Sequence, residues 1–189
     1  MIIGLTGGIG SGKSTALDVL KKNGYKTVSC DEITGELYCR RKILKRLKAE
    51  FPTAIKGGLK LYADKKEISR IVFSDKKKYD FLTDFLTRET FNIAVKRAKK
   101  IKGTVIVEVP LMFENDLADR FDKVIVILRE KAARTASVKA RSDLSDQEIA
   151  ARIAAQVDYD RLDLSRFTVI KNDGSKEDLA AAVLKAVEE

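Results

Sequence analysis

The residues from Gly7 to Thr15 read Gly-Gly-Ile-Gly-Ser-Gly-Lys-Ser-Thr, which fits the pattern G-x-x-x-x-G-K-[ST]. The glycines let consecutive backbone N–H groups turn inward, forming a concave nest for anions at the start of a helix. In such a loop Lys13 reaches the β and γ phosphates of a nucleotide, and the Ser14 hydroxyl can bind a Mg²⁺ ion shared with them. The expected nucleotide contacts are Gly8, Ile9, Gly10, Ser11, Gly12, Lys13, Ser14 and Thr15.

A first candidate catalytic carboxylate is Asp31, which follows a strand-like run at residues 25–30. Open α/β sheets bind ligands at the carboxyl ends of their strands, so this side chain can face the phosphate loop. An alternative is that Asp31 serves only as the N-cap of a helix beginning at Glu32.

A second carboxylate, Glu108, lies near the end of the β-branched run at residues 104–109. This is the Walker B position, where an acidic side chain can hold Mg²⁺, usually through water, or orient the reacting groups. The alternative is a partly exposed glutamate at a strand end with no chemical role. We expect Ser14 and Glu108 to be the residues that bind the metal.

The elements that must position these residues alternate along the chain. Gly24 is expected to stop a first helix that runs from Lys13 to Asn23, and Ser175 opens the last helix with a capping-box pattern. The alternation predicts an α/β fold of the P-loop NTPase type, with a five-stranded parallel, doubly wound sheet flanked by helices. Strands are expected at residues 2–6, 25–30, 104–109, 123–128 and 167–170.

Two helical insertions interrupt this core. Helical spacing recurs at 33–48, 65–73 and 76–100, so residues 31–101 exceed a simple crossover and predict a lobe that holds the acceptor. Residues 129–165 predict a two-helix lid, whose second helix opens with the capping box Ser145 to Glu148. The lid is rich in arginine, which can bring guanidinium groups to a transferring phosphate, although any one of them can be structural. These arginines are Arg129, Arg134, Arg141, Arg152 and Arg161.

Length and composition are consistent with one such domain over residues 1–189, with its core at 1–30, 102–128 and 166–189. The longest apolar run, 124–128, is far too short to span a membrane, and no signal peptide precedes the loop, so we expect a cytoplasmic protein. Two cysteines and no histidine exclude the usual zinc sites and any Ser/His/Asp or Cys/His catalytic system.

The net charge of +9 is by itself consistent with nucleic acid, a membrane surface or a polyanionic small substrate. The basic clusters lack the interleaved aromatic residues of single-strand binders, and we expect neither nucleic acid nor membrane as a partner. The oligomeric state is left open.

With these residues in view, the chain resembles the dephospho-CoA kinase family over nearly its whole length. The resemblance implies transfer of a phosphoryl group from ATP to the ribose 3′-hydroxyl of dephospho-CoA. It implies that Asp31 is the base, that Lys13 and Ser14 anchor ATP and Mg²⁺, that Arg141 is the lid arginine, and that Asn172 to Gly174 lie near adenine. The matching segments are Gly4 to Ser14, Asp31, Glu108 to Glu114, Arg141 to Gln156 and Val169 to Gly174.

The chain departs from the family pattern in its acceptor lobe. Ser29 stands where the family usually has a second aspartate, and no His-Pro pair occurs between residues 53 and 109. A nucleoside or nucleotide kinase is therefore an alternative, and a nucleotide-dependent switch or accessory protein is another. The switch is disfavoured because the chain lacks an N-K-x-D motif and a D-x-x-G-like loop.

Overall fold

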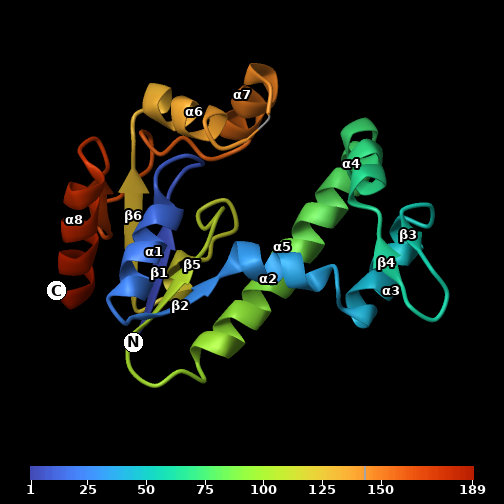
Figure 1. The fold of residues 1–189 in the computed structure, drawn as a ribbon, viewed down its shortest axis with the longest axis horizontal. Coiled ribbons are helices and arrows are strands. Elements are labelled where there is room, and N and C mark those ends of the chain that lie inside the picture. The colour runs from blue at the N-terminus through green and yellow to red at the C-terminus, as the bar shows by residue number, and fades with distance from the viewer. Residues whose placement is uncertain (143) are drawn as a thin grey trace. The chain divides into compact units, whose positions relative to one another are not determined.

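The computed structural model describes residues 1–142 and 144–189; Asp143, within the predicted lid, lies outside this description. The chain forms two compact units, one of residues 1–28 and 97–189 and the other of residues 29–96. Figure 1 follows the chain through both units in sequence order. None of the described helices is both long and apolar enough to cross a membrane.

The larger unit is built on the predicted five-stranded sheet. The pairs β1–β5, β1–β6 and β6–β7 run parallel, which confirms the doubly wound α/β fold. Strands β1 and β6 have the predicted bounds, whereas β2 and β5 are shorter than expected. In spatial order the strands are β2 (Lys26–Ser29), β5 (Val105–Glu108), β1 (Ile2–Thr6), β6 (Lys123–Leu128) and β7 (Thr168–Lys171).

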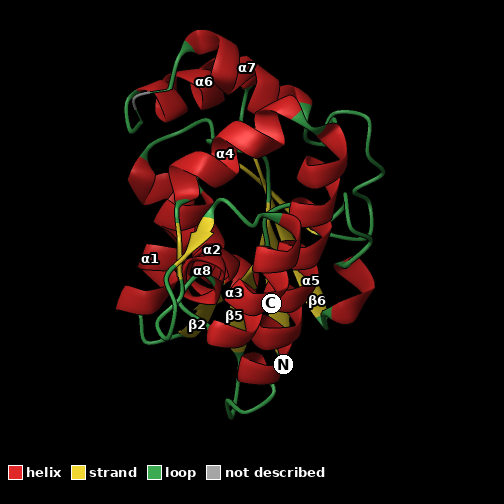
Figure 2. Ribbon diagram, turned by 90° about the vertical axis from the view of Figure 1, so that its right-hand side faces the viewer, coloured by secondary structure: helices red, strands yellow, loops and turns green. Residues whose placement is uncertain are grey.

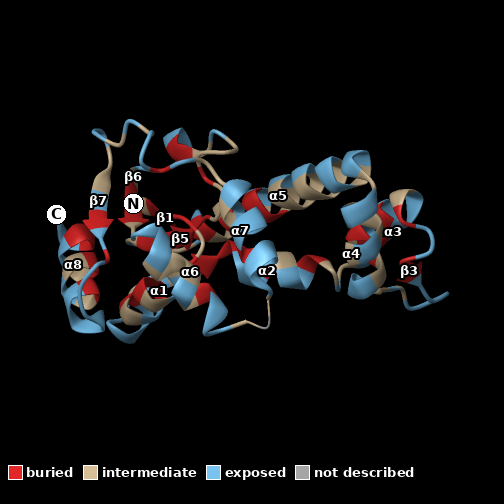
Figure 3. Ribbon diagram, turned by 90° about the horizontal axis from the view of Figure 1, so that it is seen from above, coloured by how far each residue is buried: buried red, intermediate tan, exposed pale blue. Residues whose placement is uncertain are grey.

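The core of this unit lies between the sheet and two helices, α1 (Lys13–Lys22) and α8 (Lys176–Glu188). Side chains of the central strands and of these helices interdigitate there, and Figure 3 shows the buried residues along β1, β5 and the inner face of α8. Burial of apolar surface on this scale is what stabilises an α/β sheet layer. The participating residues include Ile3, Leu5, Leu17, Leu20, Ile106, Ile125, Ile127, Leu179 and Val183.

The register of β1 and β5 determines what meets at the carboxyl edge of the sheet. Leu5 pairs with Glu108, and the Thr6 hydroxyl donates a hydrogen bond of 2.9 Å to the carbonyl of Val109. The chain then leaves β1 directly into Gly7. The phosphate loop and Glu108 are thus held on adjacent strands.

The predicted lid contains the expected two helices, α6 (Lys131–Lys139) and α7 (Asp146–Ala154). A short 3₁₀ helix, η1 (Ala118–Arg120), precedes β6. The predicted capping box is present: the Ser145 hydroxyl accepts from the Glu148 N–H, and the Glu148 carboxylate accepts from the Ser145 N–H. The same box, from Ser175 to Asp178, opens α8. Figure 2 shows α6 and α7 as neighbouring helices.

The smaller unit has an apolar core of its own. The helix predicted at 33–48 is two helices, because Arg40 is extended between them. Between the second and third helices of this unit the chain forms a two-stranded antiparallel hairpin. The elements of the smaller unit are α2 (Cys30–Leu37), α3 (Arg41–Glu50), β3 (Ile55–Lys56), β4 (Tyr62–Ala63), α4 (Lys65–Ser74) and α5 (Lys76–Ala98). Its core includes Leu37, Leu44, Leu47, Phe51, Ile55 and Ile68.

Candidate active site

The phosphate loop joins β1 to α1 with its N–H groups gathered at the start of the helix. Gly12 is the N-cap in the left-handed conformation, with φ of 107°, and no side chain caps this end of α1. The first N–H groups of a helix need an acceptor, and an anion at the N-terminus supplies one. Lys13 opens the helix and Ser14 follows it with an exposed side chain, as the motif predicts.

Two loop glycines are also required by packing. A Cβ atom at Gly10, where φ is 77°, would collide with the backbone carbonyl of Arg134. A Cβ atom at Gly12 would collide with the side-chain amide of Asn172. The loop is therefore enclosed by α6 on one side and by the segment after β7 on the other.

The Lys13 side chain folds back over its own loop. Its Nζ donates hydrogen bonds of 2.7 Å to the carbonyl of Gly7 and 3.1 Å to the carbonyl of Gly8. The positive charge is thereby held within the phosphate nest, where the β and γ phosphates of a nucleotide bind in loops of this type.

Two residues of the predicted lid hold the peptide groups of Ile9. The Ile9 N–H donates to Gln156 Oε1 at 2.7 Å, and Arg134 Nε donates to the Ile9 carbonyl at 3.0 Å. Sequence reasoning did not single out either residue, although Arg134 was one of the five lid arginines and Gln156 ended the segment that carries the family resemblance. Arg141, which the resemblance put forward, is exposed just after α6 and is not among the residues that line the cavity described next.

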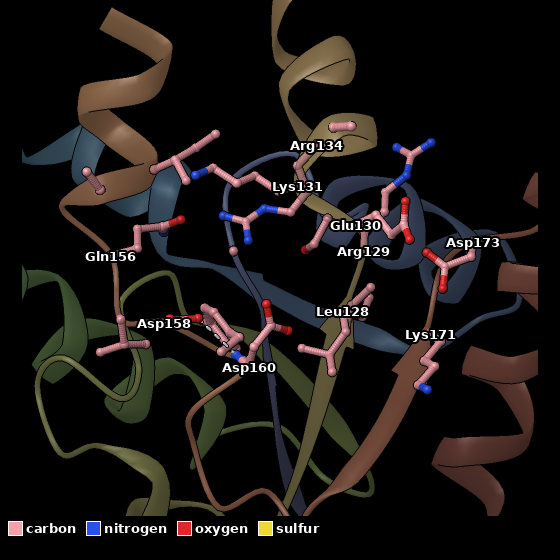
Figure 4. Close-up of a pocket in the computed structure, with 18 of the residues that line it drawn as sticks. Leu128, Arg129, Glu130, Lys131, Arg134, Gln156, Asp158, Asp160, Lys171 and Asp173 are labelled. Atoms are coloured by element: carbon pink, nitrogen blue, oxygen red, sulfur yellow. Dashed lines mark hydrogen bonds between the residues drawn. The ribbon is translucent and has the colours of Figure 1, made fainter.

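A cavity of about 920 Å³ lies between the loop and these lid residues. This is within the usual size range of small-molecule sites. Figure 4 shows Lys131, Arg134 and Gln156 around it, with Lys171 and Asp173 at its other end near β7. The loop contributes Gly8 and Ser11, so the cavity opens directly onto the phosphate nest.

Asn172 braces the loop from the far side. Its side-chain amide donates a buried hydrogen bond of 2.7 Å to the Ser11 carbonyl, and the residue is 8% exposed. Its neighbour Asp173 lines the cavity, whereas Gly174 turns the chain tightly against the Asp178 carboxylate. The segment expected near adenine is thus also a support for the phosphate loop.

Replacing Asn172 by alanine should therefore destabilise the fold by roughly 1–3 kcal/mol, because the Ser11 carbonyl would be left buried without a donor. Urea denaturation measures this change. Asn23→Ala is the matched control, since Asn23 donates an exposed hydrogen bond to the Val19 carbonyl at the end of α1. The control should change stability by no more than about 0.5 kcal/mol, and equal losses for both variants would contradict the bracing role.

Glu108 is buried, with 5% of its surface exposed, at the end of β5. The side chain is therefore not partly exposed, as the alternative supposed, and its role as a metal ligand stays a prediction. A buried carboxylate on the strand beside the phosphate loop, together with the Ser14 hydroxyl, provides the hard oxygen donors that Mg²⁺ prefers. The residues present fit the predicted metal.

Glu108→Gln should raise the Mg²⁺ concentration needed for half-maximal turnover and lower kcat, because the amide keeps the shape of the side chain but not its charge. The measurement is turnover during a Mg²⁺ titration, with thermal unfolding as a check that the variant is folded. An unchanged titration with an unchanged kcat would return Glu108 to a structural role.

Asp31 lies in the first turn of α2, in the smaller unit, and its side chain is exposed. Strand β2 ends at Ser29, one residue earlier than expected, and Ser29 is the N-cap of α2, its hydroxyl accepting from the Glu32 N–H at 3.4 Å. The alternative that Asp31 is the N-cap is therefore wrong. Its role as base stays a prediction.

Phosphate loops serve switches and motors as well as kinases. Here Arg134 of α6 and Gln156, which follows α7, contact the loop backbone, and a cavity large enough for a nucleotide lies between them and the loop. This arrangement, on a parallel sheet with an acidic residue beside the loop, defines a small-molecule kinase of the P-loop class.

Comparison with known proteins identifies the family within that class. The model of the dephospho-CoA kinase family matches residues 1–178, and the chain belongs to this family. A dephospho-CoA kinase of Thermus thermophilus is 33% identical over 188 residues, covering 99% of this chain and 90% of that protein.

Solved structures agree with this assignment. A crystal structure of a Thermus thermophilus protein has a TM-score of 0.83 and 33% identity, covering 100% of this chain and 96% of that one. The dephospho-CoA kinase from Campylobacter jejuni has a TM-score of 0.72 and 25% identity, again covering 100% of this chain and 96% of that one.

Proposed function

We propose that the protein transfers the γ-phosphoryl group of ATP to the ribose 3′-hydroxyl of dephospho-CoA, giving coenzyme A and ADP. Membership of the dephospho-CoA kinase family supports this reaction. The structural observation that carries it is the Lys13 ammonium held at 2.7 Å from the Gly7 carbonyl, in a loop that opens onto a nucleotide-sized cavity.

Catalysis of phosphoryl transfer depends mostly on positioning and on neutralising charge. The loop N–H groups and Lys13 would hold the β and γ phosphates. Arg134 would add a guanidinium close to them, since it already contacts the loop at Ile9. Arg141 is kept as the second candidate for this role, and its exposed side chain would have to turn toward the loop to serve.

Ser14 and Glu108 would hold Mg²⁺. The ion would supply positive charge that offsets the charge of the nucleotide phosphates during transfer. The described residues contain no group of three or more histidine, cysteine, aspartate or glutamate side chains that could hold a metal. This is compatible with Mg²⁺ sites that rely on one or two protein oxygens together with phosphates and water.

Asp31 would accept or orient the proton of the attacking hydroxyl. A general base must be a carboxylate or similar group that substrate can reach, and Asp31 is exposed with its helix already capped by Ser29. At the other end of the cavity, Asp173 and the braced Asn172 would lie near the nucleobase.

The test is an ADP-release assay on the purified protein with a panel of acceptors: dephospho-CoA, nucleoside monophosphates and nucleosides. The proposal predicts that dephospho-CoA gives the highest kcat/KM by a wide margin. Preference for a nucleoside or its monophosphate would overturn the acceptor assignment in favour of a nucleoside or nucleotide kinase. Tight ATP binding with no turnover on any acceptor would favour an accessory protein instead.

A further inference from the structure

Tyr159 is a buried residue on the segment that follows α7, and it lines the same cavity as Gly8 and Ser11. Only 5% of its surface is exposed. Its ring packs edge-on against Phe113, with ring centroids 5.8 Å apart and an interplanar angle of 74°. This packing holds the side chain in one orientation.

The backbone that carries Tyr159 is also fixed. The Val157 N–H, two residues earlier, donates to Glu114 Oε1 at 3.0 Å, and Gln156 beside it accepts from Ile9. Glu114 ends the segment Glu108 to Glu114, which carries much of the family resemblance. These contacts place the segment that carries Tyr159 beside Ile9 of the phosphate loop.

The Tyr159 hydroxyl makes no hydrogen bond of ordinary geometry to any of the described residues. Weaker contacts with the Thr6 side chain and the Gly7 backbone only partly offset the effect of burial on its pKa. Four buried side-chain polar atoms in the described part of the chain lack a hydrogen bond of ordinary geometry, and three of them belong to residues that line the cavity. A buried polar group without a partner is costly, so such groups are rare unless a ligand completes them. The four atoms are Ser11 Oγ, Glu114 Oε2, Arg129 Nε and Tyr159 Oη.

The position of this hydroxyl indicates which part of a ligand it meets. Thr6 and the Gly7 backbone, at the start of the phosphate loop, lie next to it. Lys13 Nζ donates to the Gly7 carbonyl at 2.7 Å, so the Lys13 ammonium and the Tyr159 hydroxyl both lie beside Gly7. Asp173, expected near the nucleobase, lies with Lys171 at the end of the cavity near β7. The lysine of such a loop binds the β and γ phosphates.

We propose that the Tyr159 hydroxyl donates a hydrogen bond to the γ-phosphate of ATP, which makes it a further catalytic residue of this site. The inference rests on the proposed function, because it assumes that ATP occupies the loop. Burial raises the pKa of Tyr159 to about 12, so the hydroxyl keeps its proton at neutral pH and can act as a donor. A hydroxyl that makes no hydrogen bond of ordinary geometry to the described residues thereby gains an acceptor when the nucleotide binds.

Tyr159→Phe is the decisive variant, since it keeps the ring against Phe113 and removes only the hydroxyl. Tyr25→Phe is the matched control, because Tyr25 packs partly buried against the same unit's core and does not line the cavity. Three quantities are compared with the wild type: the Kd for a non-hydrolysable ATP analogue, the Kd for ADP, and the thermal stability without nucleotide.

Tyr159→Phe should raise the Kd for the ATP analogue by about tenfold or more, which is the usual effect of losing a hydrogen bond to a charged group. The Kd for ADP should stay unchanged. The kcat should fall by a similar factor, while the stability without nucleotide stays equal to the wild type or rises. Tyr25→Phe should leave both Kd values unchanged.

Equal changes in the Kd values for the ATP analogue and for ADP, or no change in either Kd, would overturn the inference. A loss of stability without nucleotide, with an unchanged ratio of the two Kd values, would show that the hydroxyl is a structural partner of Thr6. Failure of the proposed function would look different, because the wild type itself would then transfer no phosphate to dephospho-CoA, whatever its affinity for the two nucleotides.

Discussion

Replacing Lys13 by alanine should lower kcat/KM by roughly 10³-fold or more, which is close to complete loss of turnover. The loop would keep its inward-facing N–H groups but lose the ammonium charge that the loop itself contributes to the γ-phosphate during transfer. The Lys13 ammonium now bonds the carbonyls of Gly7 and Gly8, so those contacts hold it ready within the nest.

The measurement is ADP release with dephospho-CoA as acceptor. Lys22→Ala is the matched control, since Lys22 is an exposed lysine in the last turn of the same helix and should keep full activity. Near-normal turnover of Lys13→Ala would refute the assignment of this loop as the phosphate-binding site.

Changing Asp31 to asparagine should lower kcat by about 10² to 10⁴, the range for removing a general base, while ATP affinity stays unchanged. The loop supplies nucleotide binding, and it lies in the other unit of the chain. Thermal stability should also stay unchanged, because Ser29 and not Asp31 caps α2. Rate is therefore the quantity that reports on Asp31.

Glu32→Gln is the matched control, because Glu32 is the next residue, also exposed and also in the first turn of α2. It loses the same charge at the same helix end, so it reproduces any general electrostatic effect on the helix. Equal kcat losses in the two variants, or wild-type turnover by Asp31→Asn, would remove Asp31 from the mechanism.

Elements that depend on local chemistry could be predicted from the sequence. Strand β6 is an apolar run at 123–128 bounded by charged residues, and its predicted and observed limits are the same. The capping boxes at Ser145 and Ser175 are local contacts over three residues, and both are present. The loop from Gly7 to Thr15 belongs to this group, because its backbone geometry is set by its own glycines.

Other features depended on packing that sequence spacing does not reveal. Ser29 and Asp31 are both good N-caps, and the choice between them was set by where β2 ends. No glycine or proline occurs in residues 36–48, yet the helix breaks at Arg40, so that Leu37 and Leu44 enter one core from two helices.

The lid contacts were the hardest to foresee. Arg134 and Gln156 meet Ile9 across 125 and 147 residues of sequence. Helical spacing did not distinguish the five arginines of this segment, and the family resemblance put forward Arg141. Only the fold shows that Arg134 contacts the loop. Tyr159 carried no motif signal at all, and its buried hydroxyl, which lacks a hydrogen bond of ordinary geometry, becomes visible only in the structure.

The reaction proposed for this chain is phosphorylation of the ribose 3′-hydroxyl of dephospho-CoA. The most direct measurement is identification of the product formed from dephospho-CoA, ATP and Mg²⁺, by chromatography against authentic coenzyme A and by ³¹P NMR. We predict one product, coenzyme A with its new phosphate on the 3′ position, formed in equal amount to ADP and absent with Lys13→Ala. Release of ADP without coenzyme A, or a phosphate at any other position, would contradict the account.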